Sequence, residues 1–272
     1  RKIGELHDAL VAEGVKIPDA YKRRDPREPG RVEKELAEAK LEKLIKRLFA
    51  GQKKRIRTWL ETQLPSLKQA ELLLPEPPED LFDDPAVQAL IVALFVLALN
   101  GGIDIVNAES DDILDVLAAQ TVALDFVTFS HAEWLAGLND TTREALQSAL
   151  DLFRTTPGMT VQDVMDLLPF EPHRLQRIAI TEITRMYGKG AQIAGEQLAK
   201  DFPGVRVIKT WHTNRDERVC ERCEPLNGVS VKISQKFKGG LNTTALHPPL
   251  HINCRCWISV RTDINKSVRL QK

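Results

Sequence analysis

The sequence has few cysteines and no long uninterrupted hydrophobic run. Its four cysteines all lie after residue 219, so a disulfide framework spread over the whole chain is excluded. The longest apolar run, 86–99, is interrupted only by Gln88. Fourteen helical residues rise about 21 Å, which is less than the roughly 30 Å of a bilayer core. We therefore expect a buried core helix and no membrane among the partners of this chain.

Several common functional signals are also missing. Residues 1–14 are charged throughout and lack the apolar core of a signal peptide. We therefore expect folding in a reducing cytoplasm, where closely spaced cysteines bind metal more often than they form disulfides. The sequence contains no Gly-rich phosphate loop, GxSxG or HExxH motif. The sequence therefore lacks the usual signatures of nucleotide hydrolases, serine hydrolases and zinc proteases.

The net charge is zero, with 38 basic and 38 acidic residues, but the charges are unevenly distributed. Residues 1–75 carry 18 basic and 12 acidic side chains, and residues 171–272 carry 18 and 9. Residues 76–170 carry only 2 basic and 17 acidic side chains. An acidic middle between two basic ends indicates contact with charged partners, or between oppositely charged segments of the same or neighbouring copies.

The hydrophobic periodicity predicts an α+β fold, with a mostly helical body and a small C-terminal β-rich module. Residues 15–31 contain three prolines and read as an extended arm, and a long amphipathic helix follows from Val32 to Leu64. Pro85 begins the apolar helix, which Gly101 and Gly102 should end. After residue 203 the period changes to two, which is typical of strands. The expected segments are 1–80 (arm and long helix), 81–202 (helical body) and 203–272 (Cys/His-rich β module), with body helices at 111–119, 121–137, 139–153, 160–168 and 174–200.

The cysteine spacing predicts a metal site. Cys220 and Cys223 form a CxxC knuckle, which lets both thiolates reach one Zn²⁺. A second group of soft ligands, His251, Cys254 and Cys256, follows 31 to 36 residues after Cys220. Either Cys254 or Cys256 can complete the tetrahedron, and His247 reads as a loop residue. Two disulfides, or four buried thiols, are the alternatives.

A closed Cys/His set favours a structural zinc ion over a catalytic one, because no coordination position is left for water. The metal would also supply folding energy that so small a module lacks. The expected fold is therefore a helical body followed by a β-rich module that a structural zinc closes.

The C-terminal third resembles the phage Mu F-like head morphogenesis proteins. The resemblance spans roughly residues 160–262 and rests on a Trp, a Thr and an Asp-Arg before CxxC, then Leu-x-Gly, then Pro-Pro-x-His-x-x-Cys-Arg-Cys. The matching residues are Trp211, Thr213, Asp216–Arg218, Cys220, Cys223, Leu226, Gly228, Pro248, Pro249, His251 and Cys254–Cys256. The helix 178–185 also resembles the family's Ile-Ala-Arg-Thr-Glu segment, with Ile180 in place of the Arg.

The resemblance implies a non-enzymatic minor capsid protein of a tailed phage. Such a protein would be made in the host cytoplasm and would lie inside the virion near the portal vertex. The portal protein and other capsid proteins would be its partners, in head assembly and DNA packaging or ejection. The alternative is a zinc-dependent nucleic-acid enzyme, an HNH-like nuclease, in which His247 and Asn253 would act.

A short basic patch is a second candidate site. Lys53, Lys54, Arg55 and Arg57 follow one another on the predicted long helix. Such a patch could contact DNA phosphates or an acidic partner surface, and a solvated helix face is the alternative interpretation.

Overall fold

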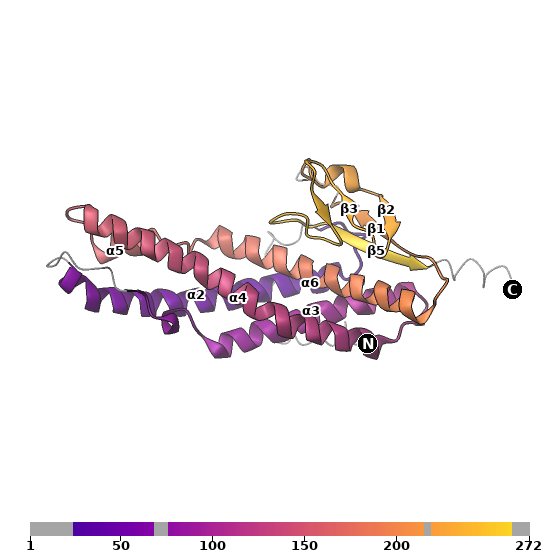
Figure 1. The fold of residues 1–272 in the computed structure, drawn as a ribbon, viewed down its shortest axis with the longest axis horizontal. Coiled ribbons are helices and arrows are strands. Elements are labelled where there is room, and N and C mark those ends of the chain that lie inside the picture. The colour runs from indigo at the N-terminus through magenta and orange to yellow at the C-terminus, as the bar shows by residue number, and fades with distance from the viewer. Residues whose placement is uncertain (1–23, 68–75, 215–218, 263–272) are drawn as a thin grey trace. The chain divides into compact units, whose positions relative to one another are not determined.

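The computed structural model describes residues 24–67, 76–214 and 219–262, and part of the predicted arm lies outside these ranges. The described helices are α2 (Arg31–Leu67), α3 (Pro85–Glu109), α4 (Val116–Thr155), α5 (Val161–Asp166) and α6 (Pro172–Asp201), with short 3₁₀ turns at Glu79–Leu81 and Glu224–Leu226. The strands are β1 (Val207–His212), β2 (Ser230–Lys232), β3 (Phe237–Lys238), β4 (Thr244–Ala245) and β5 (Trp257–Thr262). The α+β prediction, helical with small C-terminal antiparallel sheets, is confirmed (Figure 1).

The chain divides into two compact units. Unit 1 comprises Arg1–Glu42, Val92–Val127 and Gln176–Lys272, and unit 2 comprises Lys43–Ile91 and Thr128–Leu175. Each long helix contributes one part to unit 1 and another to unit 2. The predicted segment boundaries at 80/81 and 202/203 remain predictions.

The long helix α2 follows the predicted apolar stripe. Leu36, Leu41, Ile45 and Leu48 recur at steps of three to five residues and are all buried. Gly51 does not interrupt the helix. The prediction of an extended arm is wrong for the part of the arm that the structure describes, residues 24–31. Arg24 is only 4% exposed, so this part packs in unit 1.

Helix α3 is longer than the sequence indicated, because Gly101 and Gly102 lie inside it. A Cβ on Gly102 would lie 2.3 Å from the carbonyl oxygen of Tyr187, and one on Gly190 would lie 2.1 Å from that of Leu99. The glycines therefore allow the backbones of α3 and α6 to touch, and they do not end the helix.

The length of α3 also corrects the argument about membranes. Its 25 residues are long and apolar enough to cross a bilayer, although half of the most apolar 18-residue window is buried inside the structure. A core helix passes the same test of length and composition. The interpretation as a core helix therefore rests on buried residues such as Phe95 and Leu99, and the argument from a short run is wrong.

The three helices expected between 111 and 153 form one 40-residue helix, α4. Thr141 and Thr142 lie inside this helix and donate their hydroxyl hydrogens to the carbonyls four residues earlier. Thr160 and Asp163 form a capping box at the start of α5. The core of unit 2 is an apolar cluster that includes Ile56, Leu60, Leu81, Phe82, Leu146, Leu150, Phe153, Val164 and Leu168.

The strands of unit 1 form a three-stranded antiparallel sheet, ordered β2-β1-β5, and a separate β3-β4 hairpin. The buried face of β1 carries Val207, Lys209 and Trp211, and the Trp211 ring meets Phe237 edge-on at 5.1 Å. The side-chain amide of Gln192 on α6 donates to the carbonyl of Ile233, 2.8 Å away, which fixes the sheet region against α6 (Figure 1).

Candidate metal centre

The CxxC segment forms a tight knuckle after β1. The backbone N–H groups of Cys223 and Glu224 both donate to the carbonyl of Cys220, each over 2.9 Å. The turn that joins β3 and β4 supports this knuckle, because the N–H of Gly240 donates to the carbonyl of Arg222 over 3.0 Å. A Cβ on Gly240 would lie 2.1 Å from the carbonyl oxygen of Glu221, so only glycine allows the two turns to approach this closely.

The second ligand segment is a turn that leads into β5. The N–H of Cys254 donates to the carbonyl of His251 over 3.2 Å, and Asn253 between them adopts a φ of 64°. The hydroxyl oxygen of Thr181 on α6 accepts a hydrogen bond of 2.8 Å from the N–H of Asn253. Helix α6 thereby fixes the turn that carries two candidate ligands.

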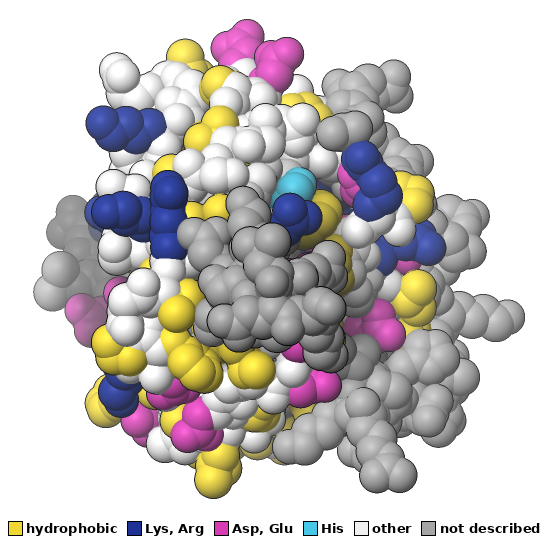
Figure 2. Space-filling model, turned by 90° about the vertical axis from the view of Figure 1, so that its right-hand side faces the viewer, with side chains coloured by type: hydrophobic (Ala, Val, Ile, Leu, Met, Phe, Trp, Pro, Cys, Tyr) yellow, Lys and Arg dark blue, Asp and Glu magenta, His cyan; other side chains and the backbone are white. Residues whose placement is uncertain are grey.

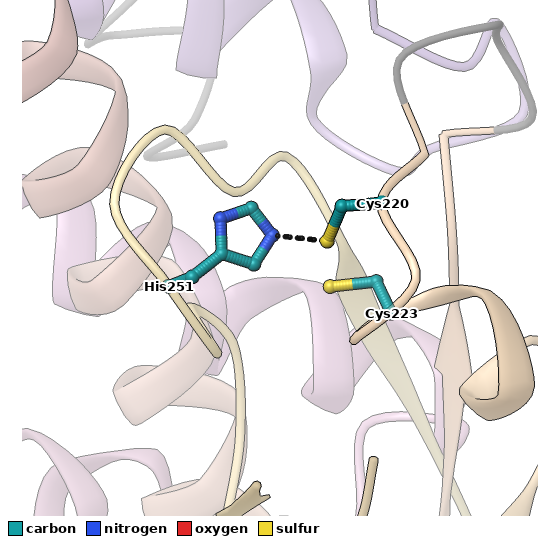
Figure 3. A group of neighbouring side chains, drawn as sticks. All are labelled: Cys220, Cys223 and His251. Atoms are coloured by element: carbon teal, nitrogen blue, oxygen red, sulfur yellow. Dashed lines mark hydrogen bonds between the residues drawn. The ribbon is translucent and has the colours of Figure 1, made fainter. Parts of the chain in front are cut away.

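The two segments bring their donor atoms together. The Sγ of Cys220 lies 3.1 Å from Nε2 of His251, and the Sγ atoms of Cys223 and Cys254 are 3.9 Å apart. Zn–S bonds of about 2.3 Å in a tetrahedron place sulfurs about 3.8 Å apart, so the second distance matches that of two thiolates sharing one zinc ion. Figure 3 shows the imidazole of His251 directed toward Cys220, with the sulfur of Cys223 beside it.

The orientation of His251 leaves one ring nitrogen available to a metal. Its Nδ1 lies 2.7 Å from the carbonyl oxygen of Ile252, which can only accept a hydrogen bond. Nδ1 therefore carries the proton, and in the neutral ring Nε2 keeps its lone pair on the side of the cysteines. Metal-bound histidines commonly have this arrangement of one nitrogen on a carbonyl and the other toward the ion.

The four cysteines are free, and three of them are buried. Hydrogen bonds from the thiols of Cys223 and Cys256, together with His251, hold the pKa of Cys254 well below its usual value. The neighbouring Cys254 in turn raises the pKa of His251 to about 9. A metal cation that binds to this cluster would therefore meet a thiolate that is already formed, and a thiolate is the ligand that a soft metal ion requires.

Five donors surround a site that needs four. Cys220, Cys223 and His251 form one group of mutually close donor atoms, and Cys223, Cys254 and Cys256 form another. The residues around these donors enclose a cavity of about 120 Å³. Cys254 interacts with both Cys223 and His251, whereas Cys256 interacts with Cys223, Cys254 and Trp211. The cluster could hold a metal ion, and its geometry favours Cys254 over Cys256 as the fourth ligand.

A buried lysine supports the module, and the sequence analysis did not single it out. Lys209 is fully buried, and its Nζ donates to Oε1 of Gln192 over 2.8 Å and to the carbonyl of Leu246 over 2.7 Å. Burial lowers its pKa to about 8. The ammonium group joins β1, α6 and the loop before His251. The only sequence signal for it was its position on the apolar face of a period-two strand.

The other sequence candidates do not belong to this cluster. His247 belongs to neither donor group; its Nδ1 lies 2.7 Å from the carbonyl of Pro248, and burial lowers its pKa to about 4. Glu182 and Arg185 on α6 form an i, i+3 ion pair at 3.3 Å. In unit 2, Lys53 and Lys54 are exposed, whereas Nε of Arg55 donates to the carbonyl of Leu81.

These features define an α+β protein whose small antiparallel β module is built around a closed cluster of cysteine and histidine donors. Residues 154–259 match the family model of the Phage Mu protein F like proteins, which confirms the resemblance over that region. This is a family of phage head morphogenesis, or minor capsid, proteins. No curated protein and no solved structure matches the chain.

Proposed function

We propose that the chain is a non-enzymatic minor capsid protein that acts in head morphogenesis at the portal vertex of a tailed phage. The observation that carries this proposal is the family match over residues 154–259, which includes every residue of the Cys/His cluster. The portal protein is the expected partner, and the interior of the virion is the expected location.

We further propose that the cluster binds one structural Zn²⁺ through Cys220, Cys223, His251 and Cys254. The set consists only of thiolates and an imidazole, which is typical of closed structural sites. The β module has a small core around Trp211 and Phe237, so the free energy of metal binding would stabilise its fold. Bound zinc would hold the knuckle and the turn before β5 together.

The geometry gives the nuclease alternative little support. A nuclease of that type requires a histidine base that can accept a proton and an open metal position. His247 is buried with a pKa of about 4, so it is a weak base. The backbone N–H of Asn253 is held by Thr181, and four strong ligands would leave no position for water.

The functional proposal can be tested in particles assembled from the genome that encodes the chain. Proteomics of purified heads, combined with chemical cross-linking, should find the chain in heads and linked to the portal protein. Its absence from particles, or its cross-linking only to tail proteins, would contradict the proposal.

A biochemical assay tests the non-enzymatic part separately. The purified, zinc-loaded chain should not cleave plasmid DNA in the presence of Mg²⁺, Mn²⁺ or Zn²⁺. Cleavage that His247→Ala abolishes without a change in the thermal unfolding midpoint would establish the nuclease alternative instead.

A further inference from the structure

The exposed face of α2 in unit 2 carries a row of six cations. These residues recur at steps of one to six positions along one side of the helix: Lys43, Lys46, Arg47, Lys53, Lys54 and Arg57. Arg57 is partly buried and the other five are exposed. Ala50 lies in the middle of this side, and Glu61 marks its end. The row spans 15 residues, three times the span of the basic patch 53–57 that the sequence indicated. Arg55 is not part of it, because its Nε donates to the carbonyl of Leu81.

This basic face is unneutralised. Within the part of the chain that the structure describes, none of its six cations forms an ion pair. Arg57 donates only to the neutral amide of Gln162, over 2.7 Å. By contrast, on the face shown in Figure 2 the Lys and Arg side chains are scattered among hydrophobic, acidic and other side chains. The basic face of α2 is therefore a concentrated source of positive potential.

Helix α4 carries the complementary charges within the same unit. Glu133, Asp140, Glu144 and Asp151 are exposed and recur at steps of four and seven residues, so they lie on one side of the helix. Arg143 and Arg154 flank this acidic face, and Arg143 pairs with Asp140 over 2.8 Å. The apolar side of α4 in unit 2, with Leu146, Leu150 and Phe153, lies opposite to the acids and joins the core.

An exposed glycine lies near the start of the acidic face. Gly137 falls between Glu133 and Asp140, inside a regular helix, where glycine costs stability relative to alanine. A Cβ added there would meet no atom within 4 Å, so the packing of the chain itself does not require glycine. A missing side chain on an exposed helix face allows another backbone to approach closely.

We propose that the basic face of α2 docks on the acidic face of α4 of a second copy of this chain. The two faces extend over similar lengths, about 21 Å for residues 43–57 and about 27 Å for residues 133–151. Each face carries a small residue, Ala50 in the middle of the basic face and Gly137 near the start of the acidic one, and these permit close helix packing. Like charges would oppose the pairing of two α2 faces, so the contact joins unlike faces.

A second copy is favoured over a nucleic acid as the occupant. Unit 2 contains eleven basic and fourteen acidic side chains, so its net charge is negative and opposes the approach of a phosphate backbone. Because the contact joins two different faces, each copy keeps one face free for a further copy. Such a contact therefore produces a closed ring or an open chain of copies. This inference goes beyond the proposed function and does not depend on it.

Sedimentation of the full-length, zinc-loaded chain tests the contact. The wild type should associate in a concentration-dependent manner at 50 mM salt and become monomeric at 500 mM, because salt screens exposed charges. A basic-face variant (Lys46→Glu, Lys53→Glu, Lys54→Glu) and an acidic-face variant (Glu133→Lys, Glu144→Lys, Asp151→Lys) should each be monomeric at 50 mM. Mixing the two variants should restore association, since each then offers a face of the opposite charge.

Substitution of Gly137 separates docking from folding. Gly137→Ala should raise the unfolding midpoint, and Gly137→Gln should keep the chain folded but weaken association at least tenfold. A matched control, Ala132→Gln, places the same side chain at an exposed position of α4 outside the acidic face and should leave association unchanged. A wild type that stays monomeric at 50 mM, or single variants that associate like the wild type, would overturn the proposal. Binding of a 30-base-pair duplex by a monomeric wild type, lost in the basic-face variant, would also overturn it and assign the face to DNA.

Discussion

Thr181 on α6 holds the turn of the candidate metal centre through Asn253, whose backbone N–H donates to the threonine hydroxyl over 2.8 Å. Asn253 lies between His251 and Cys254, and its φ of 64° is costly for a residue with a side chain. The hydroxyl also donates to the carbonyl of Arg177 within α6, so its own position is fixed. This bond joins the Ile-Ala-x-Thr-Glu segment of α6 to the cysteine motif.

Thr181→Val should weaken zinc binding without removing it. Loss of a hydrogen bond that orients metal ligands typically lowers affinity 10- to 100-fold. Competition with a chromogenic chelator would measure the change, and Thr181→Ser, which keeps the hydroxyl, should bind zinc like the wild type. Equal affinity of the Val variant and the wild type would show that the turn does not depend on this bond.

The two cysteines near the end of the cluster should respond differently to substitution. Cys254→Ser should abolish stoichiometric zinc binding, because Cys254 interacts with Cys223 and His251 together. Cys256→Ser should retain one zinc per chain, since Cys256 is a buried neighbour of that thiolate rather than a ligand. Elemental analysis of protein purified without added metal gives both values. The reverse pattern would assign Cys256 as the fourth ligand.

Spacing along the chain predicted much of this site. The CxxC and HxxCxC patterns identified all five donors, because two short segments with such spacings form tight turns whatever the rest of the fold. The capping box at Thr160 and Asp163 was predictable for the same reason, since its bonds are local. The long stripe of α2 followed directly from its periodicity.

Contacts between distant segments could not be predicted. Gly101 and Gly102 read as a helix end, but α6 packs against them and the helix continues. The hydrogen bonds of Lys209 and Thr181 join residues 17 to 72 positions apart, so no local pattern indicates them. The sequence indicated only the last part of the cation row on α2, because the basic residues of 53–57 are nearly consecutive. The helix also aligns Lys43, Lys46 and Arg47 with them from earlier turns.

Lys209→Met should destabilise the β module. The substitution fills most of the volume but leaves Oε1 of Gln192 and the carbonyl of Leu246 without their donor, which typically costs about 1–3 kcal/mol. Burial lowers the pKa of Lys209 to about 8, so the unfolded chain binds more protons than the folded one up to about pH 10.5. The stability of the wild type should therefore rise with pH across this window, and the variant should lack that rise.

Urea unfolding at pH 7, 8.5 and 10 would measure both effects. Lys232→Met is the matched control, because Lys232 is exposed on β2. If the Nζ of Lys209 contributed nothing to stability, Lys209→Met and Lys232→Met would have the same unfolding free energy at every pH.

Glu38 should make the stability of the wild type fall between pH 5.5 and 7.5. Burial raises its pKa to about 7, although the guanidinium of Arg24 opposes this rise. Glu28, Lys34 and Arg255 are the other charged groups that act in the buried network around these two residues. The folded chain binds the proton more tightly than the unfolded chain, whose carboxyl titrates near 4.5, so unfolding becomes easier as pH rises from about 4.5 to 7.

A comparison of Glu38→Gln with the wild type isolates this contribution. Other titrating groups, and any zinc lost at low pH, affect both proteins alike. The decrease in unfolding free energy between pH 5.5 and 7.5 should be smaller in Glu38→Gln by about 2 kcal/mol. Identical pH dependence in the two proteins would mean that Glu38 is ionised throughout and is fully compensated by Arg24.

Gly190→Ala should destabilise unit 1 because it would separate α3 from α6. The new Cβ would lie 2.1 Å from the carbonyl oxygen of Leu99, and both atoms belong to helix backbones that cannot yield locally. Overpacking of this kind typically costs about 1–3 kcal/mol. Gly137→Ala is the matched control, since its Cβ meets no atom within 4 Å and alanine favours a helix by about 1 kcal/mol. Thermal unfolding should therefore shift in opposite directions for the two variants, and a stabilising Gly190→Ala would show that α3 and α6 lie farther apart than this crossing requires.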